Sequence, residues 1–250
     1  MARKVQFDPN SKVPFKISRS KIDLFLECPR CFYFDAKLGV SRPRIPGYTL
    51  NSAVDILLKK EFDLLRKEGK AHEIMKKYKV DAVPYQHPKM EDWRNTFVGV
   101  RYLHPKTDLL VFGAVDDVWV NPQGELHIVD YKSTSTEKEI SLDDKYKQSY
   151  KIQMEVYQWL FRKNGFKVSD AGYFVFANAG KNRPVFDGRL EFELSIIPHK
   201  GDDSWVEKVV MDIKKCLESS ELPKSSPTCE YSNYRVAFAV AGKKHKTPRE

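Results

Sequence analysis

The apolar positions along the chain recur at helical spacing in some segments and at strand spacing in others. The clearest amphipathic helix is expected over residues 49–67, where Gly69 follows as a stop signal. Its apolar residues lie three or four positions apart in most cases: Leu50, Val54, Leu57, Leu58, Phe62 and Leu65. Further helices are expected over residues 18–28, 72–78, 150–163 and 205–218.

Shorter apolar runs predict strands between these helices. They cover residues 98–103, 109–120, 126–133, 172–177 and 190–197. Asn121-Pro-Gln-Gly124 suits a hairpin turn between two of them, whereas the proline-dotted segment 81–97 predicts irregular structure. The pattern predicts an α/β fold with a mixed central β-sheet flanked by helices. We expect one domain over residues 1–250, with a flexible N-terminal arm (about 1–15) and a basic C-terminal tail (about 241–250).

Charge and composition narrow the class of partner. The 250-residue chain has 43 Lys and Arg against 34 Asp and Glu, a net charge of +9, which favours polyanions and nucleic acid first. No apolar run approaches the length of a membrane span, and the opening MARKVQFDPNSKVPF lacks the apolar core of a secretion signal. We therefore expect no membrane partner and a cytoplasmic location. Four cysteines in a chain of this size do not make a disulfide scaffold.

Two strand-like stretches end their apolar runs on acids, Gly113-Ala-Val-Asp116 and Ile128-Val-Asp130-Tyr-Lys132. Side chains alternate across a strand, so Asp130 and Lys132 share one face and Tyr131 points to the other. If the strands pair, Asp116 joins them, and alternation places its rival Asp117 on the opposite face. Two carboxylates and an ammonium on one face predict a metal-dependent phosphodiesterase centre.

Hydrolysis of a phosphodiester needs charge neutralised on the phosphate and a nucleophilic water, and a divalent ion supplies both. Hard ions such as Mg²⁺ or Mn²⁺ prefer oxygen ligands, which Asp116, Asp130 and the backbone carbonyl of Tyr131 offer. Lys132 is then placed to orient the attacking water or to stabilise developing negative charge. Acids at strand ends are common in proteins, so the prediction depends on the two strands being read together.

With these motifs the chain resembles the PD-(D/E)XK nuclease superfamily, in particular its RecB-type and CRISPR-associated exonuclease branch. Four stretches carry the resemblance: Ser20-Lys-Ile-Asp-Leu-Phe-Leu-Glu-Cys-Pro-Arg-Cys-Phe-Tyr-Phe34, Gly113-Ala-Val-Asp116, Val129-Asp-Tyr-Lys132 and Gln153-Met-Glu-Val-Tyr157. The resemblance implies a single domain with a restriction-endonuclease-like core, Mg or Mn dependence and DNA as substrate. It also implies that Gln153 and Tyr157, four apart on one helix face, lie beside the active site and contact nucleic acid.

The family pattern breaks at two places. Relatives often carry a histidine ligand on a helix before the strands, but Gly47-Tyr-Thr-Leu-Asn51 has asparagine there, whose neutral amide oxygen is a weaker candidate ligand for a hard cation. Asp55, four residues on, is a replacement ligand or an ordinary helix-surface acid. Relatives also often bind an iron–sulfur cluster through four cysteines, and here Ser232 stands where a cysteine is expected. Cys28, Cys31 and Cys229 remain as cluster or metal ligands, with Cys216 as a fourth if the fold brings it near. We favour a lost cluster or none, because ligation normally needs four cysteines.

The leading hypothesis is a metal-dependent DNA nuclease, an exonuclease acting on single strands or frayed ends. Lysines over residues 59–79 and 138–151 are placed to steer a phosphate backbone or to form a solvated surface. The alternatives are a catalytically weakened, nuclease-like DNA-binding protein, which Asn51 favours, and an accessory subunit of a DNA repair complex with a helicase or repair partner.

Overall fold

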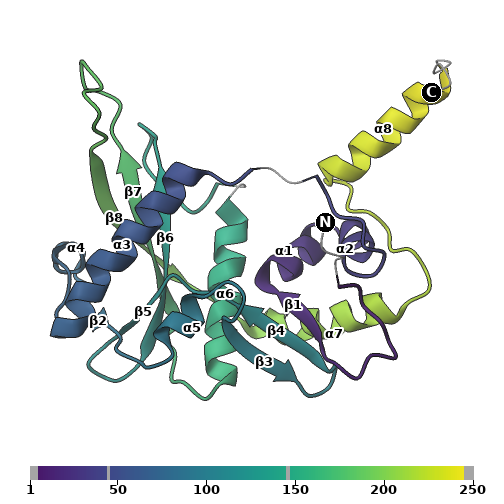
Figure 1. Ribbon diagram of the computed structural model, residues 1–250, viewed down its shortest axis with the longest axis horizontal. Coiled ribbons are helices and arrows are strands. Elements are labelled where there is room, and N and C mark those ends of the chain that lie inside the picture. The colour runs from purple at the N-terminus through teal and green to yellow at the C-terminus, as the bar shows by residue number, and fades with distance from the viewer. Residues whose placement is uncertain (1–4, 44–45, 145–146, 245–250) are drawn as a thin grey trace. The chain divides into compact units, whose positions relative to one another are not determined.

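The computed structural model describes residues 5–43, 46–144 and 147–244 (Figure 1). These residues fall into two compact units. The sheet unit comprises Pro46–Leu103 and Val111–Val206, and the cysteine unit comprises the described parts of Met1–Ile45, His104–Leu110 and Glu207–Glu250. The expectation of one domain over residues 1–250 stays a prediction.

The sheet unit is built on a five-stranded mixed sheet in the order β2-β5-β6-β7-β8. Its strands are β2 (Val83–Pro84), β5 (Asp117–Val120), β6 (Leu126–Thr134), β7 (Ala171–Ala179) and β8 (Phe192–Lys200). β6 and β7 run parallel, and the other neighbours pair antiparallel. The turn around Asn121–Gly124 joins β5 to β6 as the sequence predicts. The predicted mixed α/β fold with flanking helices is therefore confirmed, and it is consistent with a restriction-endonuclease-like core.

Helix α3 (Thr49–Glu68) covers one face of this sheet. Its buried Phe62 stacks on Trp119 of β5 and leans on Tyr131 of β6, with ring centroids 5.5 Å apart in both cases. The helix ends at Gly69, which adopts the left-handed conformation (φ 64°) that glycine tolerates best. The predicted helix over 49–67 is thus confirmed, and its apolar stripe faces the sheet.

Helix α6 (Gln148–Lys163) covers the opposite face. Alternation along β7 sends Val175 into the α3 side of the core and Phe174 toward α6, where it meets the Tyr150 ring at 6.1 Å. At Gly172 the helix comes so close that an added Cβ would lie 2.3 Å from the Met154 sulfur. The sheet is therefore enclosed between two helices.

Two segments of the chain differ from the sequence prediction. The run 109–120 is not one strand, because β4 (Leu109–Gly113) and β5 are separated by Ala114–Asp116. The Val115 amide donates a hydrogen bond to the Trp93 carbonyl at 3.1 Å, which diverts the backbone toward α5 (Met90–Arg94). Helix α5 lies in the segment predicted to be irregular. Along the chain, α4 (Glu73–Lys77) and α5 precede β3 (Val100–His104).

The cysteine unit contains β1 (Phe15–Ser18), α1 (Arg19–Glu27), α2 (Pro29–Ala36), most of α7 (Ser204–Glu218) and α8 (Glu230–Lys244). The Ser18 hydroxyl caps α1 by accepting a hydrogen bond from the Lys21 amide at 3.3 Å. Pro29 occupies the first turn of α2, where its missing N–H costs no hydrogen bond. Helix α8 was not expected from the sequence.

Both predicted terminal segments are partly described. Residues 5–14 form neither helix nor strand, but Phe7 is buried, packs on Phe15 at 5.6 Å and donates its amide to the Ala36 carbonyl. Part of the predicted arm is therefore packed. Helix α8 includes 241–244 of the predicted tail, whereas 1–4 and 245–250 lie outside the described residues. Every described helix is too short or too polar to cross a membrane. The cytoplasmic location stays a prediction.

Candidate active site

Asp116 lies in the bend just before β5, next to the middle strand β6. Three groups hold it there. The Arg94 guanidinium donates to its backbone carbonyl at 2.9 Å, the Tyr131 amide donates to Oδ2 at 3.0 Å, and the Lys59 ammonium lies 2.9 Å from Oδ1. Its side chain keeps 23% of its surface exposed, so it remains accessible to solvent ions.

Along β6, successive side chains alternate as the sequence predicts. Tyr131 points into the core beneath α3, and its hydroxyl donates to Asp117 at 2.7 Å. Asp130 and Lys132 point to the other side, where the ammonium lies 2.5 Å from Asp130 Oδ2 and 4.5 Å from the centre of the Tyr150 ring. Residues 130 and 132 therefore share a face.

The Asp130 carboxylate is almost fully buried, with 1% of the residue exposed. Burial raises its pKa to about 7; the Lys132 ammonium acts to lower it, and the neighbouring Asp116 carboxylate raises it further. Its Oδ2 has no aligned hydrogen bond among the described residues, and its contact with Lys132 is an ion pair only. A buried carboxylate in this setting is a costly charge that a cation stabilises.

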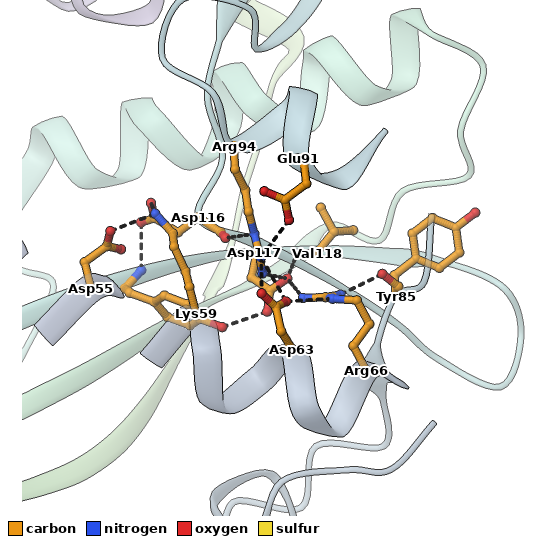
Figure 2. A network of polar contacts seen from close by, with 11 residues as sticks. Asp55, Lys59, Asp63, Arg66, Tyr85, Glu91, Arg94, Asp116, Asp117 and Val118 are labelled. Atoms are coloured by element: carbon orange, nitrogen blue, oxygen red, sulfur yellow. Dashed lines mark hydrogen bonds and ion pairs between the residues drawn. The ribbon is translucent and has the colours of Figure 1, made fainter. Parts of the chain in front are cut away.

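Helix α3 adds a lysine to the site that the sequence did not single out as a site residue. The Lys59 ammonium lies between two carboxylates, 2.8 Å from Asp55 and 2.9 Å from Asp116 (Figure 2). Burial acts to lower the pKa of Lys59, but the Asp116 and Asp55 carboxylates outweigh it and raise the pKa. The i,i+4 spacing of Asp55 and Lys59 was a readable signal, whereas the contact with Asp116 depends on the fold.

The remaining predicted residues, Gln153, Tyr157 and Asn51, differ in how they contact the site. Gln153 of α6 donates its amide to Asp130 Oδ1 at 2.6 Å, and the same nitrogen lies 3.4 Å from the Tyr157 hydroxyl. Tyr157 is buried. Asn51 is exposed at the start of α3 and donates a long hydrogen bond of 3.5 Å to the Ser133 carbonyl, just after Lys132. All of the predicted residues outside the cysteines thus lie in the sheet unit.

Asp117 belongs to a buried ionic network, which Arg94 connects to the backbone carbonyl of Asp116 (Figure 2). It is fully buried and pairs with the guanidinium groups of Arg66 and Arg94, the latter at 3.2 Å. Asp63 of α3 ties the same two arginines together, at 3.1 Å from Arg66 and 2.9 Å from Arg94. This network joins α3, α5 and β5. Asp117 is therefore held among buried partners that stabilise the fold, whereas the Asp116 side chain stays partly exposed.

The three predicted thiol ligands meet in the cysteine unit. Sulfur atoms of Cys28, Cys31 and Cys229 all lie within 4.8 Å of one another. Although burial acts to raise the pKa of the Cys28 thiol, hydrogen bonds from backbone groups and from Ser232 lower it to about 7. Burial raises the pKa of the fourth cysteine, Cys216, to about 11.

Comparison with known families decides the class of this protein. The family model of the PD-(D/E)XK nuclease superfamily matches residues 56–237, which is more than half of the chain. The chain belongs to the PD-(D/E)XK nuclease superfamily. The matched region contains Asp116, Asp130, Lys132 and Gln153, whereas Asn51 and Asp55 precede it.

Membership of the PD-(D/E)XK superfamily makes this chain a nuclease by family, with DNA as substrate class. Nucleases of this superfamily are phosphodiester hydrolases that typically use Mg or Mn. No curated protein shows a significant match to the chain. Several solved structures match, among them one described as "Crystal structure of SSO0001", with 16% identity, 95% of this chain and 90% of that chain covered, and a TM-score of 0.39.

The donor atoms of this PD-(D/E)XK site suit a hard divalent ion. The Asp116 and Asp130 carboxylates and the Tyr131 carbonyl are all oxygen donors, and Mg²⁺ and Mn²⁺ prefer oxygen. Asp130 Oδ2 is buried and has no aligned hydrogen bond among the described residues, and its only cationic contact there is the Lys132 ammonium at 2.5 Å, so it can accept a further ligand bond. The residues present therefore fit the ion that the superfamily implies.

Proposed function

We propose that this protein is a metal-dependent DNA exonuclease of the RecB-type and CRISPR-associated branch of its superfamily. It would hydrolyse phosphodiester bonds with Mg or Mn, in single strands or at frayed ends. The observation that carries the proposal is that the side chains of Asp116, in the bend before β5, and of Asp130 and Lys132, on β6, lie close together. Asp116 reaches the Tyr131 amide, and Asp130 lies between Lys132 and Gln153.

In this proposal Asp116, Asp130 and the Tyr131 carbonyl hold the ion, with Asn51 and Asp55 as additional ligands. When bound, the ion supplies charge neutralisation at the phosphate and a water of lowered pKa. Lys132, held 2.5 Å from Asp130, stabilises negative charge as it develops on the phosphate oxygens. Gln153 orients the Asp130 carboxylate through its 2.6 Å hydrogen bond, so it acts through Asp130.

A groove of about 630 Å³ beside Asn51 and Ser133 supports a single-stranded substrate. It is lined by aromatic and basic side chains at once: Tyr48, Phe186, Phe192, Lys181, Arg183 and Arg189. Tyr48 and Phe186 are 73% and 69% exposed, so their rings are free to stack on unpaired bases, while the cations pair with phosphates. Tyr157 is buried, so a direct contact between it and nucleic acid stays a prediction.

A second candidate is a DNA-binding relative with weakened catalysis. Asn51, a neutral amide where relatives have histidine, and Lys59, paired with both Asp55 and Asp116, favour this alternative. Either form could act as a subunit of a DNA repair complex, which copurification with a helicase would support.

The deciding experiment incubates the purified full chain with end-labelled single-stranded DNA and Mg²⁺ or Mn²⁺, with and without a chelator. Circular single-stranded DNA and RNA of the same sequence are the matched substrates, and Asp130→Asn is the matched protein control. Chelator-sensitive loss of linear DNA with intact circles supports the exonuclease. Cutting of circles makes the enzyme an endonuclease, and binding without any degradation favours the second candidate.

A further inference from the structure

We propose that three cysteines and a serine in the cysteine unit bind one zinc ion and no iron–sulfur cluster. These four residues, here called the thiol site, are Cys28, Cys31, Cys229 and Ser232. The proposal does not depend on the nuclease function, because it concerns donors that belong to another unit of the chain.

The thiol site is formed by the starts of two helices. Cys28 directly precedes α2 and Cys31 is its third residue, while Cys229 directly precedes α8 and Ser232 is its third residue. Each helix therefore presents two donors in C-x-x-C or C-x-x-S spacing, the spacing by which helix starts and turns chelate tetrahedral metals. The two pairs are 198 positions apart between Cys31 and Cys229, so only the fold brings them together.

The distances between donor atoms are those of ligands around a single ion. Cys31 Sγ lies 3.6 Å from Cys229 Sγ, and Ser232 Oγ lies 3.7 Å from Cys31 Sγ and 3.8 Å from Cys28 Sγ. Tetrahedral zinc, with Zn–S bonds of about 2.3 Å, places neighbouring sulfurs about 3.8 Å apart. A cube of four irons and four sulfides is much larger than one ion, and its cysteine ligands stand correspondingly further apart.

The surroundings of the thiol site suit anionic sulfur. Cys28 and Cys229 are buried, with at most 1% of either residue exposed, so their thiolates need positive charge nearby. The Arg42 guanidinium donates to Cys229 Sγ at 3.3 Å, and the Ser232 amide donates to the same sulfur at 3.4 Å. Three thiolates and Zn²⁺ leave one negative charge, which lies next to the Arg42 guanidinium, a cation that Glu27 also pairs with at 2.6 Å. Donors of this kind around a metal ligand orient it and tune the site.

The test measures metal in the purified full chain by elemental analysis, then replaces it with Co²⁺ and records the absorption spectrum. We expect about one zinc per chain and, after exchange, the charge-transfer and d–d bands of tetrahedral cobalt thiolate. Cys31→Ser and Cys229→Ser should lose both signals. Cys216→Ser is the matched control and should keep them, because Cys216 lies on α7 outside the thiol site.

Ser232→Cys provides a gain-of-binding arm that does not depend on how the cysteine variants fold. A fourth thiolate should tighten zinc binding by roughly tenfold or more and strengthen the cobalt charge-transfer bands. Iron and sulfide in stoichiometric amounts would overturn the proposal in favour of a cluster. A wild-type chain that contains no zinc and gives no cobalt thiolate bands, with Ser232→Cys no different, would overturn it in favour of ordinary buried thiols.

Discussion

The Lys59 ammonium lies 2.9 Å from the Asp116 carboxylate, so a predicted metal ligand already has a cationic partner from the chain itself. The same ammonium lies 2.8 Å from Asp55, and both carboxylates share its charge. A divalent ion that approaches Asp116 therefore meets a neighbour of like charge. Lys59 opposes metal binding and at the same time neutralises two acids when no ion is bound.

We therefore expect Lys59→Met to tighten Mn²⁺ binding by roughly tenfold, because removal of one charge about 4 Å away is worth about 1 kcal/mol or more. Isothermal titration of the full chain with Mn²⁺ measures this directly. Lys60→Met is the matched control, since it removes the same charge from an exposed neighbour on α3 and should leave the affinity unchanged. Weaker binding in Lys59→Met would mean that Lys59 supports the ion instead.

Lys132→Ala should reduce DNA cleavage by roughly a hundredfold or more while DNA affinity changes little. Its ammonium is held by Asp130 and by the Tyr150 ring, where it can stabilise charge on the one phosphate that reacts. It adds little to DNA affinity, because that affinity comes from many phosphate contacts. Cleavage rates under single-turnover conditions and filter binding separate the two effects. Lys89→Ala, an exposed lysine of the same unit outside the segments predicted to steer DNA, is the control. Full cleavage by the Lys132 variant would remove the proposed mechanism.

Gln153→Leu should weaken Mn²⁺ binding by roughly tenfold, because the amide that holds Asp130 Oδ1 at 2.6 Å is lost from a buried carboxylate. Gln148→Leu, on an exposed position at the start of the same helix, provides the comparison and should bind as the wild type does. Equal affinities for the two variants would show that the Gln153 hydrogen bond does not position Asp130.

Strand alternation was sufficient to predict which side chains of β6 share a face. Asp130 and Lys132 lie together and Tyr131 lies opposite, because a two-residue period leaves no other arrangement once the strand is recognised. The sequence was also sufficient to recognise Asp116, the acid before β5. The side chains that surround Asp116 could not be predicted from the sequence. The Lys59–Asp116 contact joins residues 57 positions apart, and no local pattern encodes it.

The elements that were missed lack a clear apolar period. Helix α8 exposes large apolar residues such as Tyr234, Val236 and Phe238, so its pattern does not separate a buried face from a polar one. No turn residues mark the break between β4 and β5, because apolar residues flank Asp116 and Asp117 on both sides, and the break depends on the hydrogen bond of Val115 to Trp93. The break is therefore set by a tertiary contact and not by the local sequence pattern.

The buried network around Asp117 predicts a large effect on stability. Asp117→Asn removes the negative charge that two buried guanidinium groups and the Tyr131 hydroxyl share, so the free energy of unfolding should fall by roughly 3–5 kcal/mol. Urea unfolding followed by circular dichroism measures the loss. Asp81→Asn, exposed in the same unit, should change the unfolding free energy by less than about 0.5 kcal/mol. Equal stabilities would contradict a structural role for Asp117.

The raised pKa of Asp130 predicts how metal binding depends on pH. With no ion bound, burial raises this pKa from 3.8 to about 7, so the carboxyl is mostly protonated below pH 7, and Mn²⁺ must displace that proton. Mn²⁺ affinity should therefore rise by about tenfold per pH unit up to pH 7 and level off above it. The same shift affects the free energy of unfolding of the metal-free chain. The protonated Asp130 stabilises the folded state, and this stabilisation is lost as pH rises through about 7. Calorimetry in two buffers of different ionisation enthalpy detects about one proton released per ion at pH 6. Asp130→Asn should abolish that release, and a pH-independent affinity between pH 5.5 and 7 would contradict the raised pKa.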